Sequence, residues 1–238
     1  MKLDILVFAV HPDDAELGCA GVILKEISLG KKVGIIDLTR GELGTRGTAE
    51  TRASEAAEAA KILGIHVRDN LSMRDGFFRN DETHQLQIIE MIRKYQPDII
   101  ITNALHDRHP DHGRAGDLVN DAVFLSGLLK IETTNAGGKQ QAWRPRLLLQ
   151  FIQDYYIKPD IVIDVTEFWD QKMESVLAYK TQFHNPDLAG EKTYISSPEF
   201  LKMVESRARE YGKYINATFA EGFTCKKLLG VDNLSHLH

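Results

Sequence analysis

The chain has 238 residues, of which 43% are hydrophobic and 26% charged, an ordinary composition for a globular protein with one large core. A net charge of −5 without a dense basic cluster argues against a nucleic-acid-binding protein. The two cysteines fit no redox or metal-binding spacing, and the first apolar run, which ends at His11, is too short for a secretory signal or a membrane span. We therefore expect a reduced, cytoplasmic protein that does not act at a membrane.

Apolar runs of strand length alternate with helical periodicity through the first half of the chain. Strands are predicted at residues 3–10, 32–39, 66–73 and 98–102, and helices at residues 15–29, 49–63, 83–95 and 111–129. Asp13 or Asp14 is the expected N-cap of the first helix. The alternation of strand and helix is typical of a parallel sheet with right-handed crossovers.

The second half is less regular but continues the same domain. The expected features are a polar loop at 133–142, strands at 146–152 and 160–165, helices at 167–183 and 198–214, and a polar stretch at 184–197. We predict a single α/β domain over residues 1–238. Its Rossmann-like, doubly wound, mostly parallel sheet has the order 3-2-1-4-5 plus extra strands. Residues 1–130 form the core, and residues 131–238 supply the remaining strands, helices and substrate-side loops.

The tripeptide His-Pro-Asp occurs twice, each time just after a predicted strand. The first copy lies in His11-Pro12-Asp13-Asp14 and the second in His109-Pro110-Asp111-His112. In a sheet of order 3-2-1-4-5 the first and fourth strands are neighbours, and ligands bind at the carboxyl ends of strands where the order reverses. We therefore expect the two segments to face each other across one crevice.

The side chains of these segments suit a divalent-metal site. The candidates are His11, Asp13, Asp14, His106, Asp107, His109, Asp111 and His112. Zinc takes imidazole nitrogen and carboxylate oxygen ligands, and a catalytic site uses three protein ligands and keeps one position open. The eight candidates are more than the three ligands that one catalytic zinc needs. The additional side chains suit a hydrolytic site, where a base must lie beside the ion.

Three other interpretations of the sequence stay open. The loop at 40–48 has the spacing G-x-x-G-x-x-G after the second strand, which differs from the dinucleotide fingerprint, so it is a substrate-side loop or a flexible connector. A non-catalytic Rossmann-like nucleotide binder would need a glycine loop after the first strand, where this chain has two carboxylates that repel phosphate. A purely structural metal site would usually be closed by four protein ligands, often cysteines.

The two motifs also resemble a known family. Ala9-Val10-His11-Pro12-Asp13-Asp14 and His109-Pro110-Asp111-His112 are similar to the two signatures of the LmbE-like, PIG-L-type zinc N-deacetylases. Residues 41–45 and 51–64 also match that pattern. Residues 107–113 and 220–223 resemble most closely the bacillithiol-biosynthesis branch, whose members remove acetate from N-acetylglucosaminyl malate. The resemblance implies a metal-dependent hydrolase of a linear amide bond.

It also implies roles for particular residues. One zinc ion per chain would be held by three ligands: His11, Asp14 and His112. Asp13 would be the general base toward the attacking water. His109 would stabilise the oxyanion or protonate the leaving amine, and Asp111 would orient it. Iron or cobalt could occupy the same ligands as zinc.

The resemblance further implies a small amino-sugar substrate and a homo-oligomer, a trimer or a hexamer. Arg52, Arg108, Asp75 and Tyr194 would contact the substrate, with Tyr194 in a stretch that could act as a flap. An arginine is the side chain expected to meet the carboxylates of malate. Within the same class of enzyme, the alternatives are a thiol-conjugate amidase and a deacetylase of another N-acetyl amino sugar, such as diacetylchitobiose.

Overall fold

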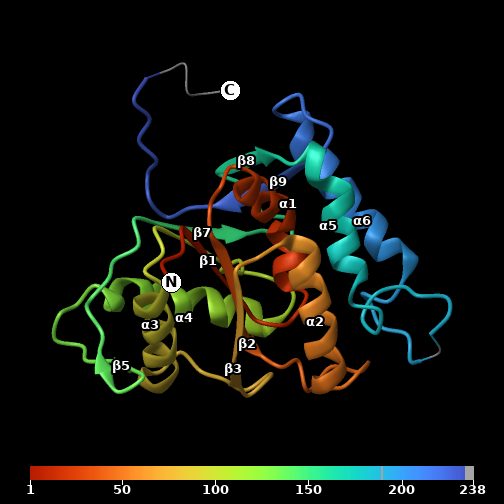
Figure 1. The fold of residues 1–238 in the computed structure, drawn as a ribbon. Coiled ribbons are helices and arrows are strands. Elements are labelled where there is room, and N and C mark those ends of the chain that lie inside the picture. The colour runs from red at the N-terminus through yellow and green to blue at the C-terminus, as the bar shows by residue number, and fades with distance from the viewer. Residues whose placement is uncertain (189, 234–238) are drawn as a thin grey trace.

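The computed structural model describes residues 1–188 and 190–233 (Figure 1). In chain order the elements are β1 (Ile5–Ala9), α1 (Asp14–Ser28), β2 (Val33–Thr39), α2 (Ala49–Leu63), β3 (Val67–Met73), α3 (Glu82–Tyr95), β4 (Ile99–Thr102), α4 (Pro110–Ser126), β5 (Thr134–Asn135), β6 (Gly138–Lys139), β7 (Leu147–Phe151), β8 (Ile161–Asp164), η1 (Thr166–Phe168), α5 (Trp169–Leu177), α6 (Pro198–Lys213) and β9 (Ala220–Thr224). None of the described helices is both long and apolar enough to cross a membrane.

One sheet joins the two halves of the chain. Its order is β3-β2-β1-β4-β7-β9-β8. The first five strands are parallel, and β9 runs antiparallel to both β7 and β8. Because β7 is the fifth of the predicted strands, the predicted α/β fold with the order 3-2-1-4-5 is confirmed. The prediction missed β9, which lies between β7 and β8.

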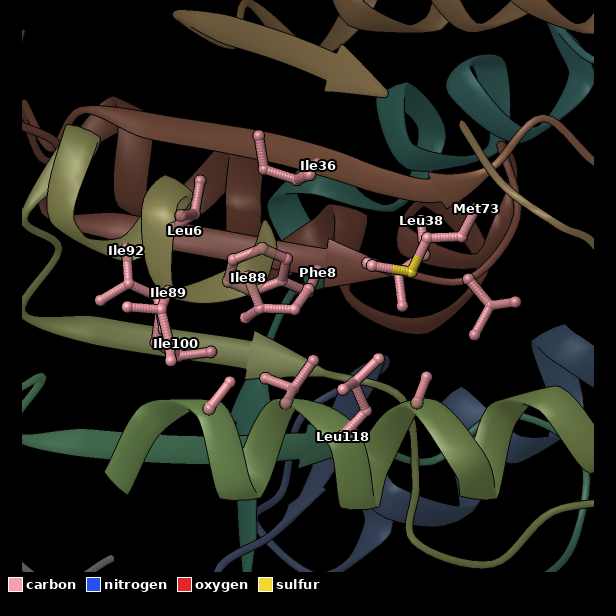
Figure 2. Packing of buried hydrophobic residues seen from close by; sticks show 14 of the residues in the cluster. Leu6, Phe8, Ile36, Leu38, Met73, Ile88, Ile89, Ile92, Ile100 and Leu118 are labelled. Carbon is pink, nitrogen blue, oxygen red and sulfur yellow. The ribbon is translucent and has the colours of Figure 1, made fainter. Parts of the chain in front are cut away.

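Helices cover both faces of this sheet (Figure 1). On one face Leu6 and Phe8 of β1 pack with residues of α3 and α4, as Figure 2 shows for Ile88 and Leu118. On the other face the alternate β1 residues, such as Val7, join a second cluster with α1. Burial on both faces explains why β1 is a continuous apolar run without alternation.

The N-terminal helix α1 is interrupted at Cys19, whose φ of −150° and ψ of 17° are not helical. Beyond the kink, the backbone N–H groups of Gly21 and Val22 donate to the carboxylate of Glu221 on β9, at 2.9 and 2.8 Å. Lys172 of α5 donates to the same carboxylate at 2.6 Å. The last strand is thereby bound to the first helix through a buried, charge-neutralised contact.

Three local predictions need correction. Helix α5 ends at Leu177 rather than at 183, and turns follow it. The loop predicted at 133–142 contains the short antiparallel pair β5 and β6. Asp13 occupies the N-cap position of α1, but its side chain makes no cap hydrogen bond with the helix. Its carboxylate instead accepts a hydrogen bond from Arg52, because burial beside that guanidinium offers an ionic partner.

Candidate metal centre

The two His-Pro-Asp segments meet at the carboxyl ends of β1 and β4, which are paired in register. A cavity of about 470 Å³ opens there. Of the residues predicted for the site, it is lined by His11, Asp13, Asp14, Arg52, Asp75, Arg108, His109, His112 and Tyr194. Asp111 lies behind this lining, fully buried. The expectation that the two segments face one crevice is therefore met.

Two imidazoles and one carboxylate converge in this cavity. Asp14 Oδ2 lies 3.4 Å from Nδ1 of His11 and 3.3 Å from Nε2 of His112. The far nitrogen of each ring binds another carboxylate, His11 Nε2 to Asp75 at 3.0 Å and His112 Nδ1 to Asp107 at 2.6 Å. Metal-ligating histidines commonly have such a carboxylate on the second nitrogen, which fixes the ring and its tautomer. The chemistry of these side chains therefore suits a divalent cation near Asp14 Oδ2, His11 Nδ1 and His112 Nε2.

The charges of the site favour a cation. Burial lowers the pKa of His11, but hydrogen bonds and charges from Asp14 and Asp75 outweigh it and raise that pKa to about 10. Burial likewise lowers the pKa of His112, and the charge of Asp14 with the hydrogen bond of Asp107 raises it to about 9. Burial raises the pKa of Asp14, yet the two imidazoles hold it well below its usual value. The surrounding carboxylates therefore attract positive charge.

Other ligand combinations are geometrically close. Ligand atoms of His11, His109 and His112 lie within 4.8 Å of one another, and so do those of His11, Asp75 and Asp111. Nδ1 of His109, however, accepts a hydrogen bond from the backbone N–H of Asp111 at 3.3 Å. The carboxylate of Asp111 is also occupied, by Gly76 N–H and Arg114. The structure therefore brings His11 together with His109 and His112 and with Asp75 and Asp111, and it does not select one set of three ligands.

Two residues that the sequence did not single out hold Asp14 in place. Gln153 donates from Nε2 to Asp14 Oδ1 at 2.5 Å, and Asn103 donates from Nδ2 to Asp14 Oδ2 at 3.2 Å. The backbone N–H of His11 donates to the same Oδ2 at 3.0 Å. Asn103 directly follows β4 and Gln153 closely follows β7, so polar residues after neighbouring strands were a signal for both.

Asp13 lies beside the three convergent side chains in a strained conformation. Its φ of 125° is one that residues other than glycine rarely adopt, and such strain is found mainly at functional sites. Arg52 donates from Nη2 to Asp13 Oδ2 at 2.8 Å and to the carbonyl of Pro12 at 2.6 Å. Burial raises the pKa of Asp13 to about 7, although Arg52 opposes the rise. Asp13 can therefore take up a proton near neutral pH.

His109 lies against both convergent imidazoles. Its ring centroid is 4.8 Å from that of His11 and 5.0 Å from that of His112. Burial, followed by the charges of His11 and His112, lowers the pKa of His109. With Nδ1 accepting from the backbone N–H of Asp111, the proton of the neutral ring is on Nε2. The link from Asp111 to His109 thus runs through the main chain and not through the carboxylate.

The cavity mouth contains charged and aromatic side chains. The guanidinium of Arg108 lies 4.7 Å from the ring centroid of Tyr194, and its Nε donates to Asp154 at 3.1 Å. Residues 43–46 of the glycine-rich loop also line the cavity, which favours the substrate-side interpretation of that loop. His106 does not line it and lies beside Tyr155, with the ring centroids 5.3 Å apart.

Comparison with known proteins agrees with this geometry. The sequence profile of PIG-L, described as GlcNAc-PI de-N-acetylase, matches residues 6–123, the part that contains both His-Pro-Asp segments. The chain belongs to the PIG-L family of LmbE-like proteins. The crystal structure of the conserved protein TT1542 from Thermus thermophilus is 34% identical with a TM-score of 0.85, covering 97% of this chain and 98% of that one.

Two curated relatives of this PIG-L-family chain have names that state an activity. The diacetylchitobiose deacetylase of Thermococcus kodakarensis is 27% identical, covering 92% of this chain and 81% of its own. The probable N-acetyl-alpha-D-glucosaminyl L-malate deacetylase 2 of Bacillus subtilis is 29% identical, covering 76% of this chain and 84% of its own. Both names describe removal of an acetyl group from an amino sugar.

Proposed function

We propose that this chain is a zinc-dependent N-deacetylase that hydrolyses the acetamide of an N-acetylglucosamine conjugate in the cytoplasm. The observation that carries the proposal is the convergence of His11, His112 and Asp14 beside an Asp13 that contacts none of them through its carboxylate. A site with three ligands and a separate base is the arrangement of hydrolytic zinc enzymes. The names of the curated relatives support the same reaction class.

His11, Asp14 and His112 would hold the metal. When bound, a divalent cation polarises the acetyl carbonyl and lowers the pKa of water. Gln153 and Asn103 keep the carboxylate of Asp14 oriented toward the two imidazoles. The site is therefore organised by hydrogen bonds of the protein, which lowers the entropic cost of binding the ion.

Asp13 and His109 would carry the proton transfers of the reaction. Asp13, with a pKa near 7, accepts the proton of the attacking water, and general bases work best when their pKa lies near the operating pH. His109, neutral with its proton on Nε2, would donate a hydrogen bond to the oxyanion of the tetrahedral intermediate, and the proton that Asp13 takes from water would pass to the leaving amine as the C–N bond breaks. A single such donor is worth about 3–4 kcal/mol of transition-state stabilisation.

We propose N-acetylglucosaminyl malate as the first substrate to test. Arg108 supports this choice, because it lies at the cavity mouth and a guanidinium binds carboxylates in a bidentate manner. Diacetylchitobiose is the second candidate, favoured by the relative that covers 92% of this chain. It carries no carboxylate, so Arg108 should matter little for its hydrolysis.

Release of acetate or of the free amine by the zinc-loaded protein tests the function. The panel contains N-acetylglucosaminyl malate, diacetylchitobiose, free N-acetylglucosamine and an amide-linked thiol conjugate. Activity should vanish on chelation and return with zinc. Arg108→Ala should lower kcat/KM for the malate conjugate more than for free N-acetylglucosamine, whereas Arg79→Ala, which removes an exposed arginine outside the cavity, should change neither. Failure to release acetate from every substrate would refute the proposal.

A further inference from the structure

Asp154 is held at the mouth of the metal cavity by its own main chain. It follows β7 and lines the cavity, and its side chain is 15% exposed. Its backbone N–H donates to Oδ1 of Asp107 at 3.2 Å, and its carbonyl oxygen accepts from Nη2 of Arg207. The other oxygen of Asp107 binds His112. The position of Asp154 is therefore set without its carboxylate, which is free for another role.

The carboxylate of Asp154 binds Arg108, whose side chain is 45% exposed. Oδ2 of Asp154 accepts from Nε of Arg108 at 3.1 Å. The guanidinium carbon of Arg108 lies over the ring of Tyr194, 4.7 Å from its centroid. Within residues 1–188 and 190–233, the two terminal Nη groups of Arg108 have no hydrogen-bond acceptor. The protein thus holds one edge of the guanidinium and leaves the end with two nitrogens open.

The other two arginines of the cavity lining are engaged elsewhere. Arg52 binds the carboxylate of Asp13. Arg46 donates from Nε and Nη1 to main-chain carbonyl oxygens, at 2.7 and 3.2 Å. Arg108 is therefore the lining guanidinium whose two terminal nitrogens can both bind one carboxylate of a substrate, in the bidentate geometry that makes such pairs strong.

We propose that Asp154 is a positioning residue that favours substrates with a carboxylate on the group attached to the sugar. It keeps the open end of the Arg108 guanidinium at the cavity mouth before the substrate arrives, so the arginine loses less conformational entropy on binding. Ordering one long side chain weakens binding by about 3–10-fold, which is the gain expected from Asp154. This inference rests on the proposed deacetylase function and adds the chemical class of the substrate.

The charge of Asp154 acts in the opposite direction, which allows a sharp test. A carboxylate beside the arginine repels an anionic substrate, so electrostatics alone predicts tighter binding when the charge is removed. Asp154→Asn removes the charge but keeps an oxygen that can accept from Arg108, whereas Asp154→Ala removes both. Each variant keeps the backbone N–H that binds Asp107, so the contact of Asp107 with His112 is left in place.

Glucosaminyl malate, the amine that deacetylation of the malate conjugate would release, is the probe. Its binding to the zinc-loaded full chain is measured by titration calorimetry. Asp154→Ala should raise the dissociation constant about 3–10-fold, and Asp154→Asn should bind at least as tightly as wild type. Glucosamine, which carries no carboxylate, should bind wild type and Asp154→Ala equally. Asp117→Ala, which removes an exposed carboxylate of α4 outside the cavity, is the control.

A double-mutant cycle shows whether Asp154 acts through Arg108. In an Arg108→Ala background, Asp154→Ala should cause no further loss of affinity for glucosaminyl malate. In the kinetics of N-acetylglucosaminyl malate hydrolysis, Asp154→Ala should raise KM by the same factor as the dissociation constant, and the effect should fall on KM rather than on kcat. Thermal melting of each variant checks that it is folded.

The possible failures are distinguishable. Asp154→Ala binding glucosaminyl malate as tightly as wild type, Asp154→Asn binding it as weakly as Asp154→Ala, or an additive loss in the cycle would each overturn the role of Asp154. A wild-type chain that does not bind glucosaminyl malate would also overturn it, even if that chain deacetylates diacetylchitobiose. Absence of hydrolysis of every substrate would instead refute the proposed function.

Discussion

Replacing Asp13 by asparagine removes the proposed base with little other change. The new side chain has nearly the same size, and its carbonyl oxygen can still accept the hydrogen bond that Arg52 donates at 2.8 Å. Asparagine also tolerates positive φ better than most residues, so the strained backbone at 125° should persist. The substitution therefore tests proton transfer rather than folding.

The Asp13→Asn substitution should lower turnover by the amount that a general base contributes. General-base catalysis contributes about 10²–10⁴-fold, which corresponds to about 3–5 kcal/mol in activation free energy. No second carboxylate replaces Asp13 at low cost, because Asp14 and Asp75 are bound to the imidazoles. The loss should appear in kcat. Zinc content should stay at the wild-type level, since the carboxylate of Asp13 binds Arg52 and is not among the proposed ligands.

Acetate release under single-turnover conditions, with zinc measured on the same samples, provides the assay. Asp117→Asn is the matched control, because Asp117 is an exposed carboxylate on α4. Turnover within about tenfold of wild type would remove Asp13 as the base, for which at least a hundredfold is expected. Loss of zinc together with turnover would show instead that Asp13 is a ligand.

Three further predictions concern metal affinity and stability. Asp107→Ala removes the carboxylate behind His112 and should weaken zinc binding about 10–100-fold in competition with a chromophoric chelator. Arg68→Ala leaves two buried carboxylates without their cation and should lower the free energy of unfolding in urea by about 3–5 kcal/mol. Gly18→Ala places a Cβ 2.3 Å from the Phe151 ring and should cost about 1–3 kcal/mol, whereas Gly138→Ala meets only one atom at 3.6 Å and should be tolerated. Unchanged zinc affinity of Asp107→Ala would contradict the first prediction. A wild-type urea midpoint for Arg68→Ala would contradict the second, and equal melting temperatures of Gly18→Ala and Gly138→Ala would contradict the third.

The sequence predicted the crevice between the two His-Pro-Asp segments because its position follows from general rules of sheet topology. Alternating strands and helices imply a parallel sheet, and the reversal of strand order places the ends of β1 and β4 together. The segments 11–14 and 109–112 follow those strands, so His11 and His112, about a hundred positions apart, could be placed at one site. Their ligand roles stay predictions until metal binding is measured.

The features that the sequence did not predict depend on partners far along the chain. Strand β9 contains Glu221, and glutamate is usually exposed. Here the Glu221 carboxylate is buried, and it accepts hydrogen bonds from the backbone N–H of Gly21 beyond the kink of α1 and from Lys172. Asn103 and Gln153 are ordinary polar residues until the fold brings both to Asp14. Their positions after β4 and β7 indicate that Asn103 and Gln153 lie near the crevice, but no local pattern identifies the partner of each contact, which lies 49 to 200 positions away.

The bond between Glu221 and the kinked first helix has a consequence for the order of events during translation. A nascent polypeptide that has emerged only through α4 already contains both His-Pro-Asp segments. It lacks Gln153, which orients Asp14. It also lacks Glu221, which accepts the hydrogen bond of the Gly21 N–H beyond the kink of α1. We therefore expect this partial polypeptide to bind a divalent metal poorly, and the complete candidate site to form only after β9 has been translated.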